Sequence, residues 1–282
     1  MKRSSILGLV LLVIACFATN SVVTRYLVAR GLMDPAAVTI ARFAAGAAML
    51  ALILAIQGRS REAWPRLSDA PMVFFLGGYA LAIAYGYRHI TAAAGTFVFY
   101  ALVIVVMAAG GTRPTSRATL GAIMALAGVA LLALGRVKGP TPLGVLLLAL
   151  TGATWGAYSL GLRKRGATLV TNARAFMGVA WLLPLLAWIE RDALVWSPVG
   201  LAMGLGMGAI TTALAYALWA RVLPALTPIE AGTFQLLVPI LTAAAGVVLL
   251  AEPFTWRLGL AGTLVLLGMK LTTAPRLPKS NS

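Results

Sequence analysis

The stretch Phe17-Ala-Thr-Asn-Ser-Val-Val-Thr-Arg25 returns 138 residues later as Trp155-Gly-Ala-Tyr-Ser-Leu-Gly-Leu-Arg163. Three further short matches follow in the same order: Ala41-Arg42 with Ala173-Arg174, Ala84-Tyr85 with Ala215-Tyr216, and Ala94-Gly-Thr-Phe97 with Ala231-Gly-Thr-Phe234. All four offsets lie between 131 and 138 residues. Self-similarity at a nearly constant offset indicates that the chain consists of two related halves.

The sequence between these matches is apolar in long blocks. A helix needs about 20 largely apolar residues to cross a bilayer. Ten segments are predicted to do so: Ser5–Ala29, Pro35–Gln57, Ala70–Tyr87, Thr91–Gly110, Ala118–Gly135, Pro142–Leu162, Thr171–Ile189, Pro198–Trp219, Pro228–Ala251 and Trp256–Thr273. Residues 1–138 and 139–282 would then each form one five-helix repeat. Because five is odd, the second repeat enters the membrane from the opposite side, so the predicted fold is an all-α membrane protein with two inverted repeats.

Composition supports a membrane protein and excludes most other classes. Of the 282 residues, 61% are hydrophobic and 11% are charged, with a mean hydropathy of +0.93. Soluble domains carry about a quarter charged residues, so a soluble globular fold is excluded. The chain has one cysteine, Cys16, and one histidine, His89. These are too few side chains for a typical cysteine or histidine metal site, and they make a nucleophile–histidine pair hard to build. We therefore expect neither an enzyme nor a resident metal or cofactor.

The basic residues carry information about orientation. The net charge is +16, from 23 Lys and Arg against 7 Asp and Glu. With the N-terminus in the cytoplasm, 14 of the basic residues fall on the inner side and 7 on the outer side. This bias predicts a multi-pass protein of the bacterial inner (plasma) membrane with both termini cytoplasmic. Because the charges are distributed loop by loop, they do not predict a nucleic-acid surface.

Two arginines, Arg42 and Arg174, fall inside predicted spans at aligned positions of the two halves. Each lies within two turns of an expected membrane surface. A long basic side chain at that depth can reach the surface or bond helix-end carbonyls. Structural anchoring is therefore the favoured interpretation of both residues, with substrate binding as the alternative.

One further stretch carries a resemblance to a known family. Leu226-Thr-Pro-Ile-Glu-Ala-Gly-Thr-Phe-Gln-Leu-Leu-Val-Pro-Ile-Leu241, followed by Leu250-Ala-Glu-Pro-Phe-Thr-Trp256, resembles the ninth and tenth spans of the drug/metabolite transporter superfamily, in its ten-span EamA-type branch. Within that branch the chain looks similar to bacterial aromatic amino-acid exporters. The first half departs from the pattern, with Gly111-Thr-Arg-Pro114 where the second half has Glu252-Pro253. The resemblance implies a central cavity lined mainly by spans 3, 4, 8 and 9, with spans 1 and 6 contributing.

Polar and aromatic side chains at mid-depth are the candidates for that cavity. An unpaired amide in hydrocarbon costs roughly 2–7 kcal/mol, so such groups must face a neighbouring helix or a wet cavity. The predicted substrate-binding residues are Asn20, Tyr79, Thr96, Tyr100, Trp155, Tyr158, Tyr216 and Gln235. Gly95, Gly232 and Pro239 are predicted hinges, although small residues also permit close helix packing.

The acidic residues exclude some transport chemistries. None is predicted at mid-membrane, and the one nearest the membrane, Glu230, is interpreted as part of a capping box with Thr227 and Pro228. Exchange of lipophilic cations for protons usually needs a carboxylate at mid-depth. The predicted function is a monomeric secondary transporter that exports small metabolites, amino acids first (aromatic and other neutral ones), by alternating access. An exporter of drugs or other metabolites and a lipid translocase of the same architecture stay open as alternatives.

Overall fold

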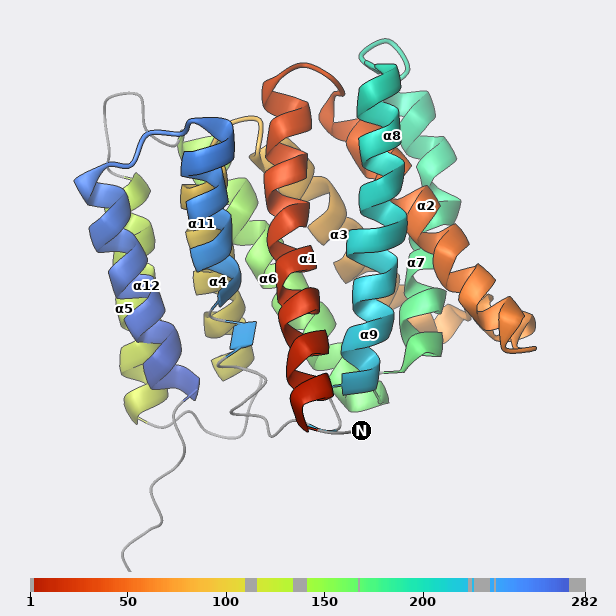
Figure 1. The fold of residues 1–282 in the computed structure, drawn as a ribbon, viewed down its shortest axis with the longest axis horizontal. Coiled ribbons are helices and arrows are strands. Elements are labelled where there is room, and N and C mark those ends of the chain that lie inside the picture. Colours follow the sequence, from red (N-terminus) through yellow and green to blue (C-terminus); the bar gives the residue numbers. More distant parts are fainter. Residues whose placement is uncertain are drawn as a thin grey trace, which may run out of the picture.

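The computed structural model describes residues 3–109, 116–133, 141–166, 168–222, 225, 234–235 and 237–273. Within these ranges the chain is a bundle of helices with one isolated β-bridge, between Met33 and Trp196 (Figure 1). The elements are α1 (Arg3–Ala29), α2 (Pro35–Ile56), η1 (Ser60–Ala63), η2 (Leu67–Asp69), α3 (Ala70–Gly86), α4 (Ala92–Ala109), α5 (Ser116–Ala133), α6 (Pro142–Arg165), α7 (Leu169–Ile189), α8 (Pro198–Gly206), η3 (Met207–Leu214), α9 (Ala215–Val222), α11 (Leu237–Leu250) and α12 (Trp256–Thr273).

Six stretches of the described chain are helical, long and apolar enough to cross a membrane: Ser4–Ala29, Pro35–Ile56, Leu67–Gly86, Pro142–Leu162, Leu169–Ile189 and Pro198–Val222. Three shorter apolar helical stretches accompany them: Ala92–Val103, Thr119–Leu131 and Leu237–Leu250. The chain is therefore a multi-pass membrane protein. These helices do not test whether the chain has ten spans, so that number stays a prediction.

Several helices begin at a side-chain cap followed by proline. Asp34 Oδ1 accepts hydrogen bonds from the backbone N–H groups of Ala36 and Ala37, and Pro35 is the first residue of α2. Thr141 caps α6 and Ser197 caps α8 in the same way, each directly before a proline. A capping oxygen satisfies a free N–H group, and proline lacks the N–H that would have no partner there. This local chemistry explains why the predicted and observed starts of these helices agree.

The helices pack in pairs around a central region. α5 lies against α12 at one edge, α2 lies against α7 toward the other, and α3 and α4 both pack on α6 (Figure 1). Glycine permits two of the closest approaches. A Cβ atom on Gly152 of α6 would overlap the Phe99 carbonyl of α4, and one on Gly208 of η3 would overlap the Arg42 carbonyl of α2. These contacts bring the backbones of α4 and α2 against helices from the other half of the chain.

Ion pairs tie helix ends together at both ends of the bundle. Arg25, near the end of α1, donates from Nε to Glu252 Oε1 at 3.2 Å and from Nη1 to the Tyr87 carbonyl at 2.7 Å. Glu252 also accepts the backbone N–H groups of Ala92 and Ala93 at the start of α4. At the opposite end, Arg165 of α6 bonds Asp69 Oδ1 at 3.0 Å, just before α3. Each pair links elements that are distant in the sequence.

Candidate functional site

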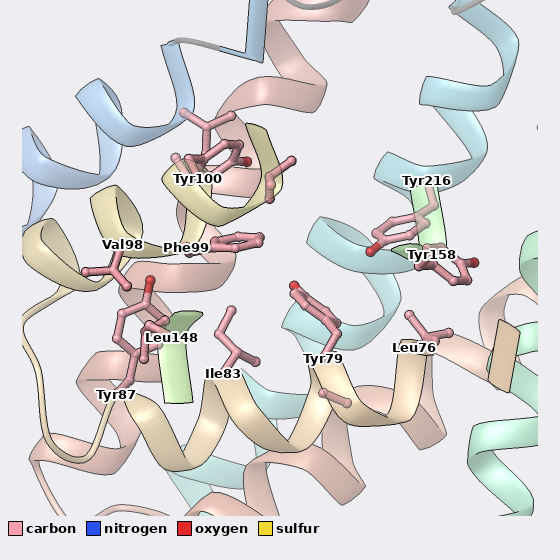
Figure 2. Packing of buried hydrophobic residues seen from close by; sticks show 14 of the residues in the cluster. Leu76, Tyr79, Ile83, Tyr87, Val98, Phe99, Tyr100, Leu148, Tyr158 and Tyr216 are labelled. Carbon is pink, nitrogen blue, oxygen red and sulfur yellow. The ribbon is translucent and has the colours of Figure 1, made fainter. Parts of the chain in front are cut away.

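A small cavity lies between the helices in the middle of the bundle. Its volume is about 20 Å³, which holds about one water molecule. Side chains from α1, α3, α4, α6 and α9, together with residue 235, line it: Phe17, Asn20, Ser21, Tyr79, Phe99, Tyr100, Trp155, Tyr216 and Gln235. No carboxylate is among these residues. Figure 2 shows Tyr79 on α3 between Phe99 on one side and Tyr216 on the other.

Aromatic rings form most of the cavity wall, with Trp155 at their centre. Its ring centroid lies 5.0 Å from that of Tyr79, 5.4 Å from that of Tyr216 and 6.5 Å from that of Phe17. Phe99 contacts Tyr79 at 6.0 Å and Tyr100 at 4.7 Å. Aromatic pairs at such separations stabilise one another beyond their area of contact. The rings therefore form one connected wall contributed by both halves of the chain.

The polar part of the wall centres on Asn20, which is 3% exposed. Its Nδ2 donates to the Thr211 carbonyl at 3.0 Å, and its Oδ1 accepts from the hydroxyls of Thr211 at 2.6 Å and Thr212 at 3.1 Å. The two threonines are consecutive and belong to η3, which is a π-helix. π-Helical turns are rare and often mark functional sites. Here the wide turn allows both hydroxyls to reach the same amide.

Arg42 lies directly behind this wall. Its Nε donates to Thr212 Oγ1 and its Nη2 to the Tyr79 hydroxyl, both at 3.0 Å, and its guanidinium lies over the rings of Phe43 and Tyr79. The side chain is only 2% exposed, so the expectation that Arg42 reaches a membrane surface is wrong. Arg174 does behave as an anchor, because its Nε bonds the Glu62 carbonyl at 3.0 Å in the loop between α2 and α3.

Comparison with known proteins identifies the family. Residues 142–274 match the model of the EamA-like transporter family. Over 276 residues the chain is 35% identical to "Uncharacterized protein PA1977" of Pseudomonas aeruginosa, covering 96% of each sequence. The chain belongs to the EamA-like transporter family. It is therefore a membrane transporter, and the family is not one of enzymes.

Two further similarities extend over much of this EamA-like transporter. "Uncharacterized transporter YwfM" of Bacillus subtilis is 32% identical over 176 residues, which are 60% of this chain and 58% of that protein. A solved crystal structure with a TM-score of 0.67 and 19% identity covers 94% of this chain and 95% of its own. That likeness shows a shared fold.

Six of the eight predicted substrate-binding residues of the EamA-like transporter line the cavity together: Asn20, Tyr79, Tyr100, Trp155, Tyr216 and Gln235. The other two lie outside it. The Thr96 hydroxyl pairs with the Tyr87 hydroxyl at 2.9 Å near the start of α4. Tyr158 lies behind Trp155, with ring centroids 5.7 Å apart, and donates to Asn172 Oδ1 at 2.9 Å. Their positions suit a supporting role for the cavity wall.

The predicted hinges of the transporter have different surroundings. A Cβ on Gly95 would lie 2.7 Å from Tyr87 Cε1, so this glycine lies at a close contact in α4. Pro239 lies in α11, and residues 234–235 before it are helical as well. Gly232 lies outside the described residues, as does the predicted capping box of Thr227, Pro228 and Glu230. A hinge role for these residues stays a prediction.

Three lining residues are absent from the predicted set: Phe17, Ser21 and Phe99. Two of them belong to α1, which the family resemblance treated as a minor contributor. A signal existed in the sequence, because Phe17 and Ser21 lie in the same repeated stretch as Asn20. Ser21 follows Asn20 directly and Phe17 precedes it by three residues, so all three share one broad face of the helix.

Proposed function

We propose that this EamA-like transporter is a secondary transporter that exports small metabolites, with neutral and aromatic amino acids as the first candidates. One observation carries the proposal. A largely aromatic cavity with amide and hydroxyl groups is built by helices from both halves of the chain. Small-molecule sites combine apolar walls with a few fixed polar groups in this way.

The lining supports aromatic and neutral side chains over cationic or phosphorylated cargo. Six aromatic residues of the lining provide rings for stacking or edge contacts. No carboxylate is present among the described lining residues to neutralise a lipophilic cation. The Gln235 amide in the lining has both donors and acceptors, which suit the polar end of an amino acid.

The transport cycle that we propose is alternating access between two inverted five-helix repeats. Carriers of this construction hold substrate near the bilayer midplane, between the repeats. A volume of about 20 Å³ is far below the 300–1,000 Å³ of ligand pockets, so the cavity must widen to admit a substrate. We also propose ten spans, both termini in the cytoplasm, a bacterial inner membrane and a monomeric carrier.

Efflux from proteoliposomes tests the function. Purified protein is reconstituted into vesicles loaded with a panel of radiolabelled amino acids, and release is followed with and without a pH gradient. We expect phenylalanine, tyrosine or tryptophan to leave faster than from vesicles without protein. The Tyr216→Ala variant, which removes one cavity ring, serves as the impaired control.

Two outcomes would contradict the proposal. If no amino acid moves while a drug, a phosphorylated metabolite or a labelled lipid does, the substrate class is wrong. If a reporter fused behind Ser282 is accessible from outside intact cells, the proposed topology is wrong. The two measurements are independent, so one part of the proposal can fail while the other stands.

A further inference from the structure

Arg42 is a buried cation whose described partners are all neutral. Its side chain bonds the Thr212 and Tyr79 hydroxyls and lies over two aromatic rings, with 2% of its surface exposed. Burying a charge is costly unless an opposite charge accompanies it. The described contacts of the Arg42 guanidinium supply no such charge.

The described carboxylates are all engaged elsewhere. Their partners are the α2 N-terminus for Asp34, Arg59 for Glu62, Arg165 for Asp69, Tyr85 for Glu190, Arg191 for Asp192, and Arg25 for Glu252. None of these six lies within 4 Å of an Arg42 nitrogen. The counter-charge for Arg42 is thus not supplied by any acid in the part of the chain that is described.

Arg174 aligns with Arg42 in the other half of the chain and shows that the repeat does not require a buried arginine at this position. Arg174 is half-buried and bonds a loop carbonyl at one end of the bundle. An anchoring arginine of this kind needs no cavity beside it. The two related positions have therefore diverged, and the buried one lies beside the candidate site.

Tyr79 connects Arg42 to the cavity. Its hydroxyl accepts a hydrogen bond from Arg42 Nη2, which leaves the hydroxyl proton free to be donated elsewhere, and its ring lines the cavity. A donor polarised by a neighbouring cation forms a stronger hydrogen bond to an anion. The nearby Asn20 lines the same cavity and shares Thr212 with Arg42.

We propose that Arg42 and the Tyr79 hydroxyl form the site that binds the carboxylate of the transported molecule. Arg42 supplies the charge and Tyr79 donates the contacting hydrogen bond. No described lining residue carries a negative charge to pair with an ammonium group, so the carboxylate supplies the charged part of the recognition. The substrate class is then monocarboxylates with an aromatic or apolar body, of which amino acids are one subset. This inference rests on the proposed transport through the cavity.

Ligand-induced thermal stabilisation of the purified full-length protein tests the site without requiring transport. The four probes share one phenyl body: L-phenylalanine, 3-phenylpropionate, 3-phenylpropanamide and 2-phenylethylamine. We expect the two carboxylates to raise the melting temperature at concentrations at least tenfold lower than the amide or the amine. If the amine or amide stabilises the protein equally well, or if no probe does, the proposal is wrong.

Substitutions then assign the preference to Arg42 and Tyr79. Arg42→Gln should abolish the discrimination between 3-phenylpropionate and 3-phenylpropanamide, whereas Arg42→Lys should keep the preference with weaker binding, because lysine retains the charge but not the planar donors. Tyr79→Phe, which keeps the ring and so the packing, should reduce the preference severalfold. Arg174→Gln, the matched control, should leave it unchanged.

The outcomes separate this inference from the proposed function. Unchanged discrimination in Tyr79→Phe and in a folded Arg42→Gln would overturn the carboxylate site, even if proteoliposomes transport phenylalanine. Conversely, stabilisation by 3-phenylpropionate without movement of any amino acid would reject amino-acid export and keep the site. If Arg42→Gln does not fold, Tyr79→Phe and Arg42→Lys still decide the result.

Discussion

Phe17 and Trp155 meet edge to face in the cavity, with ring centroids 6.5 Å apart and ring planes at 76°. They are also the first residues of the two matching stretches of the sequence, 138 positions apart. The indole ring of Trp155 additionally contacts Tyr79, Tyr158 and Tyr216. One side chain thus joins aromatic residues of α1, α3, α6 and α9 into a single wall.

Trp155→Ala should impair both transport and stability. Truncating a fully buried aromatic residue costs about 3–5 kcal/mol, and the partly buried Trp155 should cost less, through the contacts that the surrounding rings lose. We expect KM for an aromatic substrate to rise at least tenfold, whereas Trp155→Phe, which keeps a ring, should change it only a few fold. Trp181→Ala is the control, since Trp181 is 58% exposed. Equal KM values for the three variants would remove Trp155 from the site.

Asn20→Ala should destabilise the protein without removing any ring from the cavity. The change deletes the acceptor of the Thr212 hydroxyl, one of two acceptors of the Thr211 hydroxyl, and the donor to the Thr211 carbonyl. Buried polar groups left without partners cost about 1–3 kcal/mol. Thermal unfolding in detergent should show a lower midpoint than wild type. Thr19→Ala is matched to it, because the exposed Thr19 hydroxyl bonds only its own helix at Ala15, and that variant should unfold like wild type.

Glu252→Gln should loosen the end of the bundle where α1, α3 and α4 meet. The carboxylate accepts from Arg25 and from the N–H groups of Ala92 and Ala93, and an amide nitrogen would face one of these donors instead. In a parent carrying Cys16→Ser and Ser21→Cys, which places one thiol in the cavity lining, we expect maleimide to label the Glu252→Gln variant severalfold faster than the parent.

The exposed pair of Arg59 and Glu62 provides the control for that experiment. Hydrogen bonds from Arg59 hold the pKa of the Glu62 carboxyl below its usual value, but both side chains are exposed. Exposed ion pairs contribute little to stability, because water screens them. Glu62→Gln should therefore leave the labelling rate unchanged. Equal rates for Glu252→Gln and the parent would show that the Arg25–Glu252 pair does not hold the cavity closed.

Gly208→Ala and Gly206→Ala should affect stability differently, although the two positions lie only two residues apart. A Cβ on Gly208 would overlap the Arg42 carbonyl of α2, whereas one on Gly206 meets no atom within 4 Å. Overpacking of this kind typically costs about 1–3 kcal/mol. We expect Gly208→Ala to lower the unfolding midpoint and Gly206→Ala to leave it unchanged or raise it slightly. Equal midpoints would mean that α2 and η3 can move apart freely.

Much of the helical layout could be predicted from local sequence. Apolar block lengths and the cap-and-proline pairs at Asp34, Thr141 and Ser197 place helix starts correctly. The aromatic lining was predictable in part, because Tyr79 and Tyr100 lie near the middle of their segments, where an interfacial belt explains a tyrosine poorly.

The burial of Arg42 could not be predicted in this way. Depth in a single helix suggests the nearest surface as the destination of a charge, but the hydroxyls that hold Arg42 come from α3 and η3. Those partners are set by helix packing over 37 and 170 residues of separation. The π-helical conformation of Met207–Leu214 could not be predicted either, since its residues give no local signal for a π-helix.

That winding lets the second half of the bundle absorb a change in chain length. A π-helical stretch holds about one residue more than an α-helix of the same rise. Removing the exposed Ile210 would allow Met207–Leu214 to return to α-helical winding. Because the shorter stretch would cover the same rise, the residues that follow would keep nearly the same place. Tyr216 would stay against Trp155, and the loss would fall on the wide turn from which Thr211 and Thr212 both reach Asn20.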